Sequence, residues 1–208
     1  MTARRIGLGS ALLGVVVLAW ALVLKQTDGM MAAGIWPYLS LWVVMTVAMM
    51  LPSAAPMLLL VDRLSSSAAT PLFAVGYLLA WTAFGAAAYW IGSLVAWPAT
   101  GALLVAAGVY QVLPLKHACL RRCRNPLGFL RDHAGESPLR VGIIHGAYCV
   151  GCCAGLMVVL LALGMMNVVW MALVAAAVLA EKLLPGGERL APASAVVLVA
   201  SGAWIGLT

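Results

Sequence analysis

The chain has 208 residues, of which 65% are hydrophobic and 9% charged, and its formal net charge is +6. Soluble domains contain about 45 to 50% apolar and about 25% charged residues, so this composition excludes a soluble domain. It predicts an all-α, polytopic membrane protein whose surface contacts the lipid bilayer. The positive charge does not by itself indicate a nucleic-acid partner.

Apolar runs divide the chain into predicted transmembrane segments. A helix needs roughly 17 to 25 residues to cross a hydrocarbon core of about 30 Å. In chain order the predicted spans are residues 6–24, 35–61, 72–97, 100–113, 139–163, 167–184 and 192–207. The fourth is short and closely follows Pro98, so the third and fourth could form a hairpin or one broken unit. We expect about seven spans in a single domain that covers residues 1–208.

Lysine and arginine predict the orientation, because short cytoplasmic loops are enriched in them. With the N-terminus inside, eleven of the twelve fall on the cytoplasmic side, including Lys116 and Lys182, and only Lys25 falls outside. We therefore expect an N-in, C-out, multi-pass protein of the bacterial inner membrane. Residues 115–140 would be its basic cytoplasmic loop, which could also touch anionic lipid head groups.

Three cysteines lie within YCVGCCAGLM, residues 148–157, in the fifth predicted span. Steps of three and four residues place Cys149, Cys152 and Cys153 on one helix face together with His145. Glycines lie beside this face at Gly142, Gly146, Gly151 and Gly155. Small residues so spaced let another helix approach closely. A single cysteine is often only a small buried hydrophobe, but three beside an imidazole indicate a metal site near the membrane midplane.

Methionines occur at a matching depth in WVVMTVAMMLPSAAPM, residues 42–57. Met45 and Met49 lie one above the other on a helix, and Pro52 and Pro56 predict a kink. Methionine is also an ordinary filler of apolar cores, which is the alternative interpretation. Further methionines lie in the predicted outer turns at Met30, Met31, Met165 and Met166. The pattern favours thioether ligands on the outer side of the thiols.

A third group of soft ligands lies in PLKHACLRRCR, residues 114–124. If this segment is helical, Cys119 and Cys123 lie one turn apart, with His117 nearby, and could share an ion near the inner surface. The alternative is an interfacial amphipathic helix with buried cysteines. Soft thiolate and thioether ligands select Cu(I), although another soft metal would also fit. None of the six acidic residues lies near a predicted midplane, so a hard cation lacks a site.

The stretches at 42–57, 110–130 and 142–157, followed by Glu181 and Lys182, together resemble a known family. They are similar to bacterial predicted metal-binding integral membrane proteins, the domain of unknown function numbered 2182. The similarity spans about residues 36–187, and it implies metal binding without a settled reaction. At Ala154 the family often has tryptophan after the paired cysteines, so packing around the cluster could differ.

We expect a membrane protein that binds Cu(I) and transfers or transports it, rather than an enzyme. Met45 and Met49 would accept the ion, the three central cysteines would hold it, and Cys119, Cys123 and His117 would receive or release it. Its partner could be a copper chaperone or a cuproenzyme, in either direction of transfer. The alternative is a membrane thiol oxidoreductase that cycles Cys149 and Cys152 against a quinone, although a regular helix accommodates an i,i+3 disulfide poorly.

Overall fold

The structure is a computed structural model that describes residues 2–25, 34–65, 68–94, 100–163 and 167–207. Within these residues all regular secondary structure is helical. The α-helices are α1 (Thr2–Lys25), α2 (Ile35–Leu64), α3 (Ala69–Leu94), α4 (Thr100–Val112), α5 (Pro114–Arg124), α6 (Pro126–Asp132), α7 (Pro138–Leu163), α8 (Val168–Leu183) and α9 (Leu190–Leu207). A short 3-10 helix, η1 (Gly187–Arg189), precedes α9.

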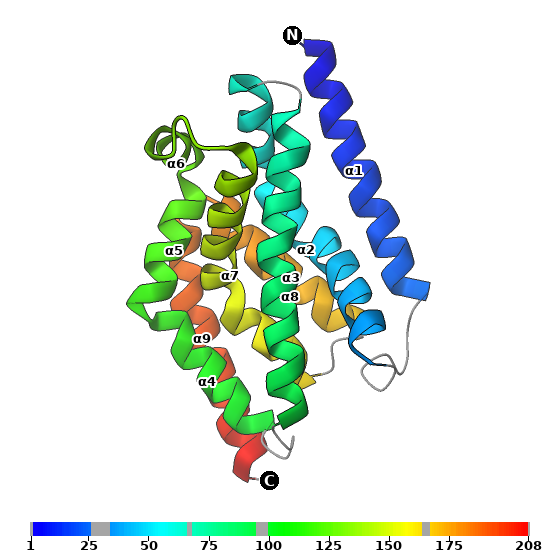
Figure 1. Ribbon diagram of the computed structural model, residues 1–208. Coiled ribbons are helices and arrows are strands. Elements are labelled where there is room, and N and C mark those ends of the chain that lie inside the picture. The colour runs from blue at the N-terminus through cyan, green and yellow to red at the C-terminus, as the bar shows by residue number, and fades with distance from the viewer. Residues whose placement is uncertain (1, 26–33, 66–67, 95–99, 164–166, 208) are drawn as a thin grey trace.

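Helix α7 lies at the centre of the bundle, where it packs against α3, α4, α5 and α8. Helix α2 packs against α1, α3 and α8, and α4 runs beside α9. Figure 1 shows α1 at one edge of the molecule, and the two ends of the chain at opposite ends of the bundle. The cysteine-bearing helix is therefore surrounded by protein on several sides.

Five helical stretches of the described residues are long and apolar enough to cross a membrane. They are Gly7–Lys25, Ile35–Leu64, Ala69–Gly92, Pro138–Leu163 and Gly187–Leu207. A sixth results if α4 and α5, which are bent by 61° relative to each other, form one broken span. Helix α8 has 16 residues, which is short for a span. An all-helical fold with five or six helices apolar enough to span a membrane is thus confirmed, whereas seven spans and the N-in orientation stay predictions.

The bend between α4 and α5 has a local cause. Leu113 adopts an extended conformation (φ −67°, ψ 142°), as the residue before a proline is biased to do. Pro114 then begins α5, where its missing N–H is not needed by the helix. The fourth apolar run therefore ends at this bend, and the basic segment that follows begins with a helix packed along α7 instead of forming a free loop.

Helix α2 continues through Pro52 and Pro56. Because proline has no N–H, Pro52 leaves the carbonyl oxygen of Ala48 without its usual helical donor. The indole Nε1 of Trp20 donates to this oxygen at 3.1 Å. The proline thus provides an acceptor that joins α2 to α1.

The glycines of α7 allow the close approach that their spacing predicted. A Cβ atom added to Gly146 would lie 2.9 Å from the carbonyl oxygen of Tyr77 on α3. At Gly151 it would lie 2.6 Å from the sulfur of Cys119 on α5, and at Gly155 it would lie 2.8 Å from the ring of Tyr110 on α4. Side chains at these positions would push three neighbouring helices away from the cysteine face.

Two of the cations that we assigned to cytoplasmic loops lie inside the bundle instead. Lys116 is 0% exposed and Lys182 is 8% exposed. Lys116 Nζ lies 2.7 Å from Glu181 Oε2, and Lys182 Nζ contacts a cysteine and a serine. A buried ammonium is tolerated only when it is paired. Lys116 and Lys182 are therefore paired inside the bundle. They no longer count among the basic residues that favour an N-in orientation.

Candidate metal centre

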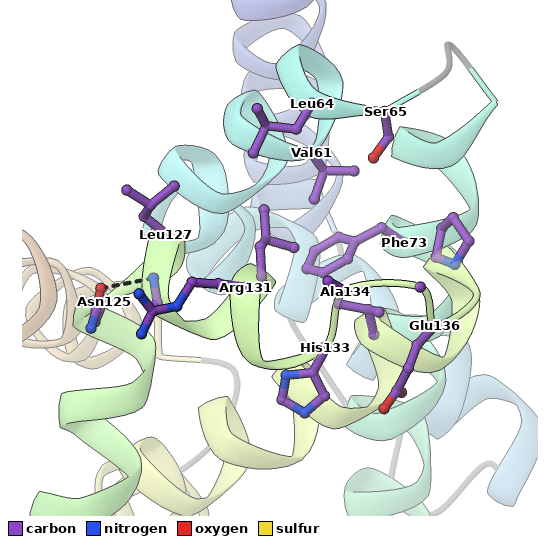
Figure 2. Close-up of a pocket in the computed structure, with 15 residues that line it drawn as sticks. Val61, Leu64, Ser65, Phe73, Asn125, Leu127, Arg131, His133, Ala134 and Glu136 are labelled. Carbon is purple, nitrogen blue, oxygen red and sulfur yellow. Dashed lines mark hydrogen bonds between the residues drawn. The ribbon is translucent and has the colours of Figure 1, made fainter.

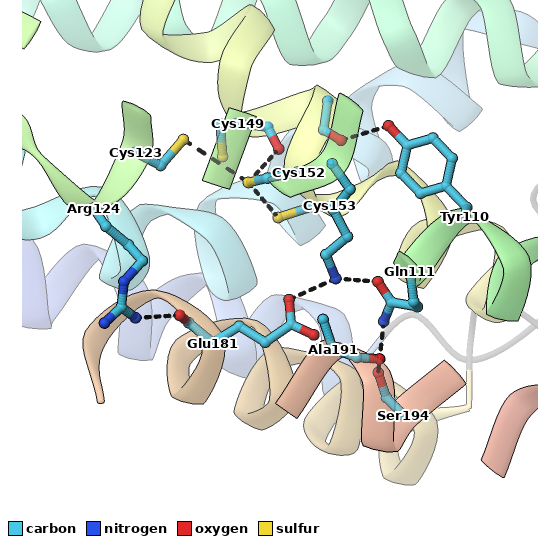
Figure 3. A network of polar contacts seen from close by, with 12 residues as sticks. Tyr110, Gln111, Cys123, Arg124, Cys149, Cys152, Cys153, Glu181, Ala191 and Ser194 are labelled. Carbon is cyan, nitrogen blue, oxygen red and sulfur yellow. Dashed lines mark hydrogen bonds and ion pairs between the residues drawn. The ribbon is translucent and has the colours of Figure 1, made fainter. Parts of the chain in front are cut away.

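Three thiols from one helix meet at the core of the bundle. Cys149, Cys152 and Cys153 are at most 2% exposed, and their sulfur atoms all lie within 4.8 Å of one another. Cys152 Sγ lies 3.4 Å from Cys153 Sγ, and it donates to the Cys149 carbonyl oxygen at 3.2 Å (Figure 3). A thiolate lies about 2.3 Å from a bound zinc ion, so two sulfurs around such an ion are separated by at most about 4.6 Å. The sulfur atoms of the cluster are therefore close to the spacing that one shared soft metal ion requires.

The sulfur of Cys149 has two polar partners from other helices. Lys182 Nζ on α8 donates to it at 2.9 Å, and the Tyr77 hydroxyl on α3 lies 2.9 Å away. Lys182 Nζ also donates to Ser53 Oγ on α2 at 3.1 Å. An ammonium group at this depth supplies the positive charge that a buried thiolate needs. Helices α3 and α8 thus meet α7 at one sulfur atom, and α2 reaches it through the bond from Lys182 to Ser53.

Helix α5 adds a fourth thiol to the cluster. Cys123 Sγ lies 3.8 Å from Cys152 Sγ, and Cys123 is only partly buried. Cys119, one turn earlier, is buried in the Gly151 gap of α7. We expected Cys119 and Cys123 to form a separate group at the inner surface. Because α5 packs along α7, Cys123 instead lies beside Cys152 of the central cluster and is only partly buried.

The two candidate histidines differ in their surroundings. His145 is 3% exposed, and its Nδ1 atom is buried without a hydrogen-bond partner among the described residues. Its ring centroid lies 5.6 Å from that of Phe73, 6.1 Å from that of Tyr77 and 5.2 Å from that of Phe129. His117 is partly exposed on α5, and in the described part of the chain no hydrogen bond joins its ring to a cysteine. Only His145 therefore lies in the interior with the thiols.

The methionines of α2 lie in the same apolar core as the thiols. Met45 and Met49 are 1% and 0% exposed and belong to the buried cluster that contains Cys149, Cys152 and Cys153. The methionines of the predicted outer turns, Met30, Met31, Met165 and Met166, lie outside the described residues. The structure thus brings thioethers from a second helix into the core around the cysteines.

Sequence reasoning did not identify Tyr77, Ser53 or Lys182 as part of this centre. Lys182 lies inside the predicted span 167–184, and an ionisable residue within a membrane segment usually faces a partner or a cavity. That signal could have separated it from the loop cations. Nothing in the sequence distinguishes Tyr77 and Ser53 from other polar residues of apolar helices.

A second buried polar network lies beside the centre (Figure 3). Lys116 on α5 pairs with Glu181 and also donates to Gln111 Oε1, and Gln111 Nε2 donates to Ser194 Oγ on α9 at 2.9 Å. Glu181 and Lys182 are adjacent on α8 and contact different helices, α5 and α7 respectively. This arrangement holds α8 in the rotation that brings the Lys182 ammonium to Cys149.

Comparison with known protein families gives one match. A family model described as PpoB2, copper chaperone, matches residues 39–205. The matched region contains all five cysteines and all three histidines. Comparison with curated proteins and with solved structures gives no match. The match agrees with the metal binding that the resemblance in sequence implied. It gives a different family name from the domain of unknown function numbered 2182.

Proposed function

The chain belongs to the PpoB2 copper chaperone family, and on this premise we propose that it binds Cu(I) at Cys149, Cys152 and Cys153 and passes the ion on within the membrane. The observation that carries this proposal is the cluster of three buried sulfur atoms within 4.8 Å of one another. Thiolate ligands favour Cu(I) over hard cations. Among the described residues, no carboxylate takes part in this cluster.

Charge at the centre supports a monovalent ion. Cu(I) held by two thiolates carries one negative charge, and the Lys182 ammonium 2.9 Å from Cys149 cancels it. An uncompensated charge in this buried position would be expensive, because the interior has a low dielectric constant. A divalent ion on the same two thiolates would be neutral and would leave the charge of the Lys182 ammonium uncompensated. The ammonium thus complements a bis-thiolate Cu(I) centre.

Transfer would proceed by exchange between neighbouring sulfur ligands. Met45 and Met49 would bring thioether ligands from α2, and the third cysteine of the cluster would help to hold the ion. Cys123 would be the next ligand, because its sulfur lies 3.8 Å from Cys152 and its side chain reaches the partly exposed side of α5. Cys119 and His117 lie on the same helix and would complete this exchange route.

The cellular setting is part of the proposal. We place the chain, as a single domain over residues 1–208, in the bacterial inner membrane with its N-terminus inside and the basic segment 115–140 in the cytoplasm. Several helices are apolar enough to span a membrane, which supports this placement. The ion would be exchanged with a copper chaperone or a cuproenzyme.

Metal analysis of the protein tests the central proposal. The protein is purified without oxygen, and its copper content is compared with that of a Cys149→Ser, Cys152→Ser, Cys153→Ser variant. We expect stoichiometric copper in the unsubstituted protein and none in the variant, while circular dichroism shows that the helices are retained. A folded variant that keeps its copper would refute the assignment.

A redox function is the second candidate, and the 3.8 Å separation of Cys123 Sγ and Cys152 Sγ favours it. The two thiols would form a disulfide and give two electrons and two protons to a quinone, which would leave as the quinol. Redox titration of metal-free protein separates the two candidates. Copper is then added to the protein. Stoichiometric copper binding that blocks quinone reduction would favour the Cu(I) transfer function.

A further inference from the structure

A pocket of about 750 Å³ lies at the end of the bundle that carries α6. Residues at the ends of α2, α3, α6 and α7 line it, with His133 and Glu136 on one side and Val61 and Leu64 on the other (Figure 2). Val141 also lines it and precedes Cys149 by eight residues on α7, which is about 12 Å along the helix. One wall of the pocket therefore lies about two turns of α7 from the first cysteine of the cluster.

A hydrogen bond fixes which nitrogen of the His133 ring is available to a metal ion. Its Nδ1 atom lies 2.8 Å from the carbonyl oxygen of Phe129. A carbonyl oxygen only accepts, so Nδ1 carries the proton, and in the neutral ring the Nε2 atom keeps its lone pair. Histidines that bind metals usually donate their other N–H group to a backbone carbonyl or a carboxylate in this way. Nothing in the sequence marks His133 as a ligand.

His145 is the buried polar group closest to this pocket on the face of α7 that carries the thiols. It precedes Cys149 by one helical turn, so the two side chains are neighbours on the helix. Its buried Nδ1 atom has no partner among the described residues, and a buried nitrogen without a partner costs free energy. A ligand that passes between the pocket and the thiols would satisfy this atom.

Two phenylalanines separate the pocket from His145. The Phe129 ring stacks on His133 with centroids 4.4 Å apart, and its edge meets the His145 ring with centroids 5.2 Å apart. Phe73 lines the pocket, is 0% exposed and lies 5.6 Å from His145 between ring centroids. An ion would reach His145 only when one of these rings moves.

We propose that this pocket is the port through which Cu(I) exchanges with the cysteine cluster, with His133 as the ligand in the port, His145 as the relay, and Phe73 and Phe129 as the gate between them. The proposal rests on the Cu(I) function proposed above. It adds a second route to the cluster besides the sulfur of Cys123. Arg131 and Glu136 both line the pocket, so its lining has no strong net charge that would repel a monovalent cation.

Loading kinetics test the port separately from the cluster. Cu(I) is supplied as a coloured chelator complex, and the loss of colour is followed in a stopped-flow instrument. The concentrations are chosen so that the rate of copper loading rises with protein concentration. We expect His133→Ala to slow loading by about tenfold while the final copper content is unchanged, because this substitution alters a barrier and not the cluster. His145→Phe should slow loading by a similar factor. His145→Phe keeps an aromatic ring among Phe73 and Phe129, so the core stays filled.

An obstruction of the pocket gives a second readout with a matched control. Ala134→Trp introduces an indole at an exposed position that lines the pocket and should also slow loading. Ala203→Trp makes the same change at an exposed position of α9 near the opposite end of the molecule and should load at the original rate. Unchanged rates in both His133→Ala and Ala134→Trp would overturn the port. An unsubstituted protein that binds no copper would overturn the proposed function itself.

Discussion

Lys182 Nζ donates a hydrogen bond to Cys149 Sγ at 2.9 Å, and these two residues lie on different helices, 33 positions apart. Both are buried, with 8% and 0% of their surface exposed. The bond joins α8 to α7 at the centre of the bundle. It also places one positive charge where a thiolate-bound ion would need it.

Removing this ammonium should weaken Cu(I) binding. Hydrogen bonds to charged groups contribute about 1.5 to 3 kcal/mol, so we expect Lys182→Met to raise the Kd for Cu(I) by roughly 10- to 100-fold. Competition with a Cu(I) chelator measures this change. Lys25→Met, at an exposed position on α1, is the matched control and should bind as the unsubstituted protein does. Equal Kd values for the two variants would contradict the charge role.

The Lys116 and Glu181 pair should matter for stability more than for copper binding. Removing one partner of a buried ion pair costs about 3 to 5 kcal/mol, so Glu181→Gln should lower the free energy of unfolding by about that amount. Glu188→Gln is the control, because Glu188 is half-exposed at its ion pair with Arg124, and such surface pairs contribute about 0 to 1 kcal/mol. Denaturation in detergent measures both. If Glu181→Gln lowers the free energy of unfolding no more than Glu188→Gln does, the network around Lys116 and Glu181 does not hold α8.

Gly151 should tolerate no side chain without displacement of α5. Its added Cβ atom would lie 2.6 Å from Cys119 Sγ, so we expect Gly151→Ala to destabilise the fold by about 1 to 3 kcal/mol through overpacking. Gly14→Ala on α1 is the control, since nothing lies within 4 Å of its added Cβ atom. Thermal unfolding measures the difference. The prediction fails if both alanine variants melt at the same temperature.

Cys123 should react first with a thiol reagent. It is the one partly exposed cysteine, whereas the other four are buried. We expect a maleimide to modify Cys123 well before the others, and bound Cu(I) to slow this modification if Cys123 acts as a transfer ligand. Mass spectrometry of timed samples measures the order, and Cys123→Ser should remove the fast phase. Unchanged labelling of Cys123 in the copper-loaded protein would argue against its part in transfer.

Met49→Leu should slow Cu(I) loading with little effect on the fold. The exchange conserves volume, so its cost should stay below about 1.5 kcal/mol, but it removes a thioether from the core around the thiols. Met57→Leu is the control, because Met57 is equally buried and packs in a separate cluster with Leu58 and Phe73. Loading rates of the two variants are compared at equal copper content. Identical rates would assign Met49 to packing alone.

Local patterns predicted a large part of the candidate centre. Apolar runs predicted helices, of which five or six are long and apolar enough to span a membrane. Steps of three and four residues placed Cys149, Cys152 and Cys153 on one face, because helical geometry follows from the backbone. The glycines of α7 predicted close helix contacts for the same reason. The inner pair, Cys119 and Cys123, was placed too far from the cluster, because the packing of α5 along α7 depends on contacts between helices that the local sequence does not show.

The sequence alone determined an all-helical chain with several helices apolar enough to span a membrane, and it placed three thiols on one helix face. Tertiary structure alone decided what surrounds that face. Tyr77 and Lys182 reach Cys149 from two other helices, and Ser53 accepts a hydrogen bond from Lys182. Lys116, which resembles a loop cation in the sequence, is buried against Glu181. The physical reason is that pairing of a buried charge depends on which helices meet and how they are rotated, which no local spacing specifies.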